Sequence, residues 1–235
     1  MSARPAQLAF DLPLAAGMSR EDFFVTEANR AALEMVERWP GQGAARSPLL
    51  ALTGPAGSGK THLAEIWRAR TSALLAGPAG VTVENIPSLL ASGHLVLEDM
   101  PGPGLDETAM FHLINMAGET GAAVLIACRE YPSRWPVSLP DLKSRLKAAQ
   151  VARLGAPEDA LLRAVLVKLF ADRQLRTGEG VITYMLTRME RSLAAARDLV
   201  AEIDRRALAE KANITRPFVA GVMKEMAAPG LFDEE

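Results

Sequence analysis

The stretch "GPAGSGKT", residues 54–61, decides the fold of this chain. It matches the pattern G-x-x-x-x-G-K-[ST] at every fixed position, which is typical of a phosphate-binding loop. The glycines let such a loop curl until its backbone N–H groups point at phosphate oxygens. We expect Lys60 to contact the β- and γ-phosphates and the Thr61 hydroxyl to bind Mg²⁺. The motif therefore predicts a site for ATP or ADP with Mg²⁺ at Gly54, Pro55, Ala56, Gly57, Ser58, Gly59, Lys60 and Thr61.

The residues on either side of this loop supply the context that the motif requires. Residues 48–53, "PLLALT", form a short apolar run between Pro and Gly, which is typical of a buried strand. A helical pattern follows from about residue 61 to residue 70. The order of strand, loop and helix argues against a chance match in an unrelated loop and indicates nucleotide binding.

Further along the chain, short apolar runs alternate with helical patterns up to about residue 155. The predicted strands are 81–83, 94–97 and 122–127, and the predicted helices are 21–39, 86–91 (a short helix or turn) and 105–118. Strands of this kind, buried on both faces and separated by helices, form parallel α/β sheets. After this point the pattern predicts helices alone, at 158–174, 178–189, 191–210 and 215–226.

The predicted fold class is therefore α/β: a parallel P-loop sheet with helices on both faces, followed by a small four-helix lid domain. The predicted parts of the chain are a flexible tail (1–20), a nucleotide-binding domain (21–155), the lid (156–228) and an acidic C-terminal tail (229–235).

Composition excludes several other classes of protein. The formal net charge is −2, which argues against a free-standing nucleic-acid binder with a strong basic excess. Cys128 is the single cysteine, so no disulfide framework can form within the chain, and a reducing compartment is the natural expectation. No apolar run approaches 18 residues, so no membrane span is predicted. We expect a cytoplasmic protein.

A second motif supplies the carboxylates that a P-loop site needs. Residues 94–100, "HLVLEDM", are mostly apolar and then present Glu98 and Asp99 at the end of a predicted strand. In such sites one carboxylate holds the magnesium-bound water, and we expect Glu98 to do this beside Thr61. The other polarises the attacking water. A pair of acids in an ordinary turn is the alternative interpretation.

A P-loop sheet followed by a four-helix lid resembles the AAA+ ATPases. The stretches "GPAGSGKTHLAEIW", "HLVLEDM", "LPDLKSRL" and "ITRPFVAGVM" are similar to the bacterial replication initiator DnaA and its shorter relatives. "DFFVTEAN", residues 22–29, resembles the segment that holds adenine in that family, which implies that Phe24 and Val25 lie near the base. His62, beside Thr61, could also approach the nucleotide, although packing is an alternative role for it.

The same resemblance assigns two arginine roles. In "LPDLKSRL" the residue that matches the family's arginine finger is Arg145, which implies that it reaches the nucleotide of a neighbouring subunit; a surface salt bridge is the alternative. The lid's second sensor arginine aligns with Ala194, one turn from Arg191 and from Arg197. We expect Arg191 to serve, with Arg197 as the alternative.

Two departures from the family predict weak intrinsic hydrolysis. The strand at 122–127 should end in a polar sensor residue, but Cys128 and Arg129 follow it. The acidic pair is Glu-Asp, whereas the initiator has Asp-Asp. Together these differences imply that the chain holds nucleotide, and ADP in particular, as a structural switch.

The tail carries a further motif, "QLAFDL", in which Gln7, Leu8, Phe10 and Leu12 resemble the clamp-docking peptide of Hda-type regulators. This resemblance implies binding to the DNA polymerase sliding clamp (its beta subunit). A flexible peptide of this kind places apolar side chains in a preformed pocket. The chain stops about ten residues past "ITRPFVAGVM", so we expect no helix-turn-helix domain and no direct sequence-specific DNA binding.

The resemblance as a whole implies a negative regulator of replication initiation that promotes hydrolysis of the ATP bound to DnaA. It also implies self-association, because AAA+ interfaces are heterologous and can repeat. A helicase loader of the same fold, or another assembly factor of the replication machinery, is the main alternative. A membrane-associated scaffold is a further one, but the sequence offers no basic amphipathic helix for it.

Overall fold

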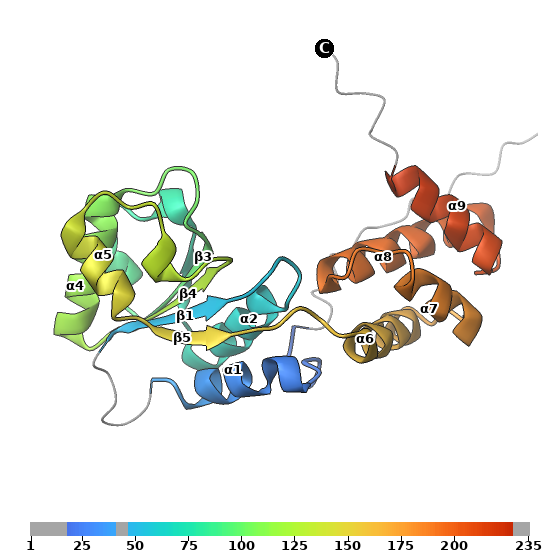
Figure 1. The fold of residues 1–235 in the computed structure, drawn as a ribbon, viewed down its shortest axis with the longest axis horizontal. Coiled ribbons are helices and arrows are strands. Elements are labelled where there is room, and N and C mark those ends of the chain that lie inside the picture. The colour runs from blue at the N-terminus through green and yellow to red at the C-terminus, as the bar shows by residue number, and fades with distance from the viewer. Residues whose placement is uncertain (1–17, 41–46, 228–235) are drawn as a thin grey trace, which may run out of the picture.

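The computed structural model describes residues 18–40 and 47–227. Within these residues the chain forms two parts that lie side by side along the longest axis of the molecule (Figure 1). The first part is a sheet covered by helices, and the second contains helices only. None of the described helices is both long enough and apolar enough to cross a membrane.

A five-stranded sheet, in the order β2-β3-β4-β1-β5, forms the first part. Every neighbouring pair of strands is parallel. The strands are β1 (Leu49–Thr53), β2 (Leu74–Ala76), β3 (His94–Met100), β4 (Ala123–Cys128) and β5 (Gln150–Arg153). β1, which leads into the P-loop, is paired on both sides, so the loop begins from a fixed interior strand.

Side chains of alternate residues in β1 enter different cores. Leu49 and Ala51 pack in the core under α3 (Ile86–Leu89), α4 (Glu107–Thr120) and α5 (Pro140–Lys147). Leu50 and Leu52 pack on the opposite face, under α1 (Glu27–Arg38) and α2 (Lys60–Thr71). Because both faces are covered, these strands are apolar throughout, which is the pattern that parallel sheets require.

The predicted fold class is confirmed, but one predicted strand is wrong. Residues 81–83 do not form a strand: Val81 is buried, whereas Val83 is 47 % exposed. The backbone N–H of Thr82 donates to the Asn85 side chain at 3.0 Å, which closes a turn in place of a strand. The strand of this region is β2, whose short sequence at the edge of the sheet carries little periodic signal.

The strand β5 and the helix α5 were also absent from the prediction, and α1 has a later start than predicted. β5 is four residues long and pairs only with β1, and α5 lies just before it. α1 begins six residues later than predicted, since Asn29 accepts a hydrogen bond from the Thr26 backbone at 2.8 Å and fixes the start of the helix. Residues 21–26 thereby stay outside the helix and can line a pocket.

The helices of the second part match the predicted lid closely. They are α6 (Asp159–Asp172), α7 (Glu179–Leu186), α8 (Leu193–Glu210) and α9 (Arg216–Ala227). Their apolar faces share one core, and Phe24, from the chain ahead of α1, packs against it. The predicted domain boundaries stay predictions, although the change from sheet to helices falls near residue 155.

Candidate functional site: a P-loop beneath the lid

The P-loop joins the end of β1 to the start of α2. Gly57 and Gly59 have φ angles of +67° and +97°, a region that residues with a side chain rarely adopt. At Gly54 a Cβ would lie 2.6 Å from the Leu154 carbonyl oxygen, so only glycine fits. The glycines of the motif are therefore required by the path of the backbone.

Lys60 folds back onto its own loop. Its Nζ donates to the carbonyl oxygens of Gly54 and Pro55 at 2.9 and 2.7 Å. Burial, followed by the positive charge of Arg129, lowers the pKa of Lys60. An ammonium held in this way is already desolvated and close to the loop amides, where phosphate would replace the carbonyls as its partner.

The sequence predicted no role for Arg129, which follows the end of β4. Its positive charge, at the end of β4, lowers the pKa of Lys60 in the P-loop. Cys128, in the neighbouring position, is buried, and that burial raises the pKa of its thiol to about 12. Cys128 is therefore a packed thiol and not a polar sensor.

Glu98 and Asp99 lie within β3, where the register with β4 shifts between Leu97 and Met100. The two side chains differ: Glu98 is half-buried, and burial raises its pKa, whereas Asp99 is exposed and has a φ of +56°. The Thr61 side chain hydrogen-bonds to Glu98 and opposes the effect of burial. The predicted pair Thr61 and Glu98 is thus brought together.

Several buried oxygens at this end of the sheet lack a hydrogen-bond partner within the described residues. Three of them are Thr53 Oγ1, Ser58 Oγ and Glu98 Oε1. Buried polar atoms are normally satisfied, so their number here indicates missing ligand atoms. Hydroxyl and carboxylate oxygens, together with water and phosphate, are the ligands that Mg²⁺ takes. The residues present therefore fit a nucleotide with bound Mg²⁺, for which Thr61 and Glu98 would supply the protein oxygens near the cation.

A pocket lies beside the P-loop, between the chain ahead of α1 and the lid. Its lining comes from the chain around the start of α1, the P-loop with α2, α6 and α8, and comprises Asp22, Phe23, Phe24, Asn29, Ser58, His62, Leu161, Val165, Lys168, Leu169, Asp172, Leu193 and Arg197. The lid contributes apolar side chains, such as Leu161 and Leu193, and the charged groups Lys168, Asp172 and Arg197 to this lining, while Asp22 comes from the chain ahead of α1. A pocket of this composition suits a flat aromatic base with a polar sugar.

The predicted base-contacting residues have different positions. Phe24 lines the pocket, but Val25 is 37 % exposed and does not. His62 also lines it; its Nε2 lies 2.9 Å from the Ser19 carbonyl oxygen, and its ring packs edge-on against Phe23. Burial lowers the pKa of His62, so its ring is neutral at pH 7. Phe24 and His62 belong to this site by position, and their contact with a base stays a prediction.

The lid meets the P-loop directly at the start of α8. The backbone N–H of Leu193 donates to the Gly57 carbonyl oxygen at 3.0 Å. Ser192, which caps α8 through a 3.0 Å hydrogen bond from Ala195, is buried against Gly57. Neither contact could be predicted from the sequence, because hydrogen bonds between segments that are distant along the chain follow no periodic pattern.

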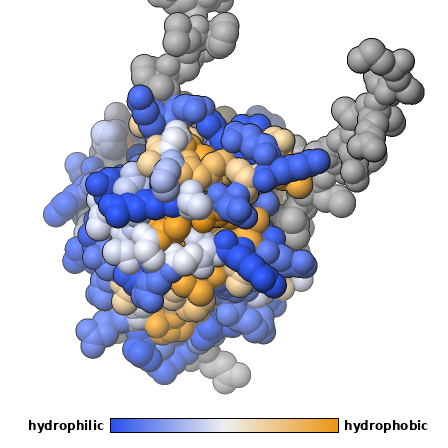
Figure 2. All heavy atoms as spheres, turned by 90° about the vertical axis from the view of Figure 1, so that its right-hand side faces the viewer, coloured by the Kyte–Doolittle hydropathy of each residue, from blue (hydrophilic) through white to orange (hydrophobic). Residues whose placement is uncertain are grey.

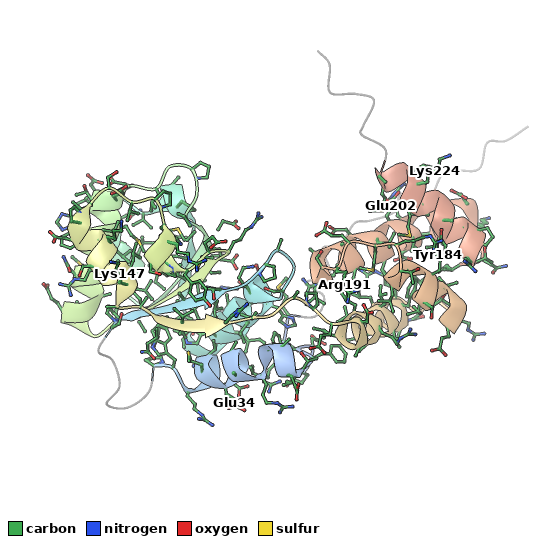
Figure 3. All side chains as sticks on the ribbon, in the orientation of Figure 1. Glu34, Lys147, Tyr184, Arg191, Glu202 and Lys224 are labelled. Carbon is green, nitrogen blue, oxygen red and sulfur yellow. The ribbon has the colours of Figure 1, made fainter. Side chains whose placement is uncertain are left out.

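The two candidate lid arginines differ in their surroundings. Arg191 is exposed and pairs with Asp159 at 2.7 Å, outside the pocket lining, on the side of the lid that faces the sheet (Figure 3). Arg197 lines the pocket, is half-buried, and has its pKa lowered by that burial. The geometry therefore favours Arg197, the alternative, over Arg191.

Arg145 lies far from this site. It is exposed on α5 and lines a separate hollow at the opposite end of the strands, with Pro48, Asn115 and Glu119 among its neighbours. Arg145 therefore does not share a site with Lys60 or Glu98. The other predicted group, Gln7, Leu8, Phe10 and Leu12, lies outside the described residues.

These features define the class of protein: a P-loop nucleotide-binding fold of the AAA+ type with a helical lid. The structure superposes on domain III of the replication initiation protein DnaA from Thermotoga maritima with a TM-score of 0.70, at 18 % identity, covering 92 % of this chain and all of that one. AMPPCP-bound DnaA from Aquifex aeolicus gives a TM-score of 0.65 at 16 % identity, covering 91 % of this chain and 70 % of that one.

Sequence comparisons narrow the class. Residues 159–223 match the family model described as "Hda, lid domain". An uncharacterized protein of Haemophilus influenzae (strain Rd) is 26 % identical over 190 residues, which cover 76 % of this chain and 82 % of that protein. The lid is therefore similar to the lid of Hda, and the fold of the chain is similar to that of DnaA domain III.

Replacing Lys60 with Ala should weaken ATP binding by about 10- to 100-fold, since a charge-assisted hydrogen bond contributes roughly 1.5–3 kcal/mol. Titration of a fluorescent ATP analogue measures the change. The matched control is Lys224→Ala, an exposed lysine on α9, which should bind as the wild type does. Equal affinity of the Lys60→Ala protein would remove this loop from the nucleotide site.

Replacing Gly57 with Ala should displace the lid from the P-loop, because the new Cβ would collide with Ser192. We expect nucleotide to dissociate about tenfold faster, a change of ~1.4 kcal/mol, as measured by stopped-flow chase of a fluorescent ADP analogue. Gly180→Ala is the control, since a Cβ there meets nothing within 4 Å. An unchanged dissociation rate for Gly57→Ala would mean that the lid contact does not retain the nucleotide.

Proposed function

We propose that this chain regulates replication initiation by promoting hydrolysis of the ATP held by a DnaA-type initiator. The match of its lid to the Hda lid and the DnaA-like fold of the whole chain support this role. The chain acts in this proposal mainly as an activator of a partner's reaction.

The chain itself holds an adenine nucleotide in the proposal, in the pocket between Phe24, the P-loop and α8. One solved structure of similar fold is that of DnaA bound to AMPPCP. Bound Mg²⁺ would neutralise charge on the phosphates. Thr61 and Glu98 hold the cation side of the site, while Lys60 and the loop amides orient the phosphates.

Its own hydrolysis is proposed to be slow, with ADP as the resident nucleotide. Glu98 is half-buried with a raised pKa, so it attracts a proton more readily than an ordinary carboxylate does. Asp99 is exposed at the irregular end of β3, and Cys128 offers no polar group to a water. This arrangement supports retention of nucleotide over rapid turnover.

The position of Arg145 carries the proposal. It lies at the end of the sheet opposite its own P-loop, so it cannot serve the nucleotide of its own chain. In the described part of the chain no carboxylate lies within 4 Å of its guanidinium, and its side chain is exposed. An exposed arginine with no ion-pair partner is available to stabilise the charge on a phosphoryl group supplied by a neighbouring molecule.

The proposal also assigns a location and an assembly. Gln7, Leu8, Phe10 and Leu12 dock on the sliding clamp and bring the chain to DNA that carries one. A peptide that orders on binding has modest affinity, which the ring of identical clamp sites raises by avidity. Self-association would use the same two surfaces, Arg145 and the nucleotide pocket, in a head-to-tail arrangement.

Replacing Arg145 with Ala should lower the stimulated hydrolysis of initiator-bound ATP by about 10³-fold, the typical value of an arginine finger. The measurement is the conversion of radiolabelled ATP on the initiator in the presence of clamp and DNA. Arg38→Ala, on α1 away from this surface, is the control, because its side chain is 82 % exposed and its pairing is weak. Hydrolysis at the wild-type rate with Arg145→Ala would exclude the finger role.

Replacing Gln7, or Leu8 and Phe10 together, with Ala should weaken clamp binding by about 30-fold or more, because anchor residues of interfaces contribute at least ~2 kcal/mol each. Surface plasmon resonance on immobilised clamp measures this. Leu14→Ala is the control, since Leu14 follows the motif without belonging to it. If the wild-type chain does not bind clamp, or the variants bind equally, the proposed location is wrong while the Arg145 test stands.

A further inference from the structure

Two exposed arginines lie over a partly buried tyrosine on the lid, outside the lining of the nucleotide pocket. The guanidinium carbon of Arg188 is 4.3 Å from the centre of the Tyr184 ring, and that of Arg216 is 4.9 Å from it. Tyr184 and Arg188 come from α7 and its end, whereas Arg216 is the first residue of α9. Figure 3 labels Tyr184 on the half of the lid that is farther from the sheet.

These two arginines differ from most others of the lid. Arg163, Arg173, Arg191, Arg205 and Arg206 each pair with a carboxylate. Among the residues that the structure describes, no carboxylate lies within 4 Å of Arg188 or Arg216; both are exposed and share one aromatic ring instead. The fold thus brings two cations together without an anion.

This juxtaposition is unfavourable unless an anion joins it. The two guanidinium carbons lie within about 10 Å of each other, which is about the Debye length at 0.1 M ionic strength, so salt does not fully screen their repulsion. Contact with an aromatic face offsets only a part of that repulsion at an exposed site. A phosphate between them would remove it and accept hydrogen bonds from both planar groups.

The cluster is also held in place. Arg188 donates to the Thr187 hydroxyl at 3.1 Å, and that hydroxyl donates to the Tyr184 carbonyl oxygen at 2.9 Å. Tyr184 packs against the lid core along one side. The arginine and the ring are therefore partly ordered before any ligand binds, which lowers the entropy lost on binding.

Two lysines of the lid are also exposed. Lys211 is exposed at the end of α8, in the short connection that leads to Arg216, and Lys224 is exposed toward the end of α9. Figure 2 shows this end of the molecule, where hydrophilic side chains surround an apolar area. Two guanidinium groups that lie over one ring match the closely spaced phosphates of a polynucleotide backbone.

We propose that Tyr184, Arg188 and Arg216 form a phosphate-binding site through which the lid contacts the backbone of DNA without reading its sequence. Binding is weak and depends strongly on salt, because few phosphates are contacted and the net charge of the chain is −2. The inference goes beyond the proposed function and does not depend on it, since neither the clamp nor an initiator is required.

The test measures binding of the full chain to fluorescent single-stranded and duplex oligonucleotides by anisotropy, over a series of salt concentrations. Changing both Arg188 and Arg216 to Gln should weaken binding to at least one form about tenfold and lower the slope of log K against log salt by about 1.5. Tyr184→Phe should bind as the wild type does, whereas Tyr184→Ala should lose affinity.

The matched control is Arg205→Gln, which removes an exposed arginine that already pairs with Glu202, and it should leave DNA binding unchanged. Titration with inorganic phosphate, followed by the tyrosine signals in NMR spectra, distinguishes free phosphate from DNA as the ligand. Unchanged DNA affinity and salt slope in the doubly substituted protein would overturn the proposal, and so would a loss of phosphate binding alone.

Discussion

One contact joins the two parts of this molecule at the place where its ligand is expected: the start of α8 lies on the P-loop. The hydrogen bond from the Leu193 backbone to Gly57 and the burial of Ser192 link the lid to a loop whose shape depends on β1 and α2. Gly57 has a positive φ and no room for a Cβ because Ser192 of the lid lies against it. The conformation of the loop and the position of the lid therefore depend on each other. A change in the conformation of the loop, such as one on phosphate binding, therefore alters the contact between the loop and the lid.

The pocket follows from this constraint. With α8 fixed on the loop, α6 and the chain ahead of α1 enclose the space beside Ser58 and His62. Lys168 of α6 reaches Asp22 at 2.9 Å, so that an ion pair also links the lid to the segment before α1. This pair is partly exposed and contributes roughly 0–1 kcal/mol, so the contact with Gly57 and the packing of Phe24 matter more.

The parallel sheet places the P-loop and Arg145 at opposite ends of its strands. The P-loop and Glu98 gather at the ends of β1 and β3, as in other α/β proteins whose ligands bind beyond the carboxyl ends of strands. Arg145 lies at the other end, beside the residues that precede β1 and β4. The length of the strands therefore separates Arg145 from the P-loop of its own chain.

The sequence predicted what local patterns encode. The P-loop motif, the buried runs of β1, β3 and β4, and the 3.6-residue period of the lid helices gave the fold class and nearly all of the lid. β2 and β5 were missed because edge strands of three and four residues lack a period long enough to detect. Residues 81–83 do not form a strand, because the Thr82 backbone N–H donates to the Asn85 side chain and the chain turns there.

The same limit applies to the site residues: local patterns locate the motif residues, but contacts with distant residues cannot be predicted from such patterns. Thr61 and Glu98 each stand at a fixed offset from a strand and lie close together, although their shared role toward Mg²⁺ stays a prediction. Helical spacing alone could not separate Arg191 from Arg197. Their separation depends on Asp159, which lies 32 positions before Arg191 in the chain and holds that arginine outside the pocket. An arginine that already has a carboxylate must give up that pair to bind phosphate, whereas Arg197 is half-buried in the lining of the pocket and has no salt bridge among the described residues. Arg145, Arg188 and Arg216 likewise have no carboxylate within 4 Å among the described residues, and all three are exposed, so an anion from outside the chain can reach them.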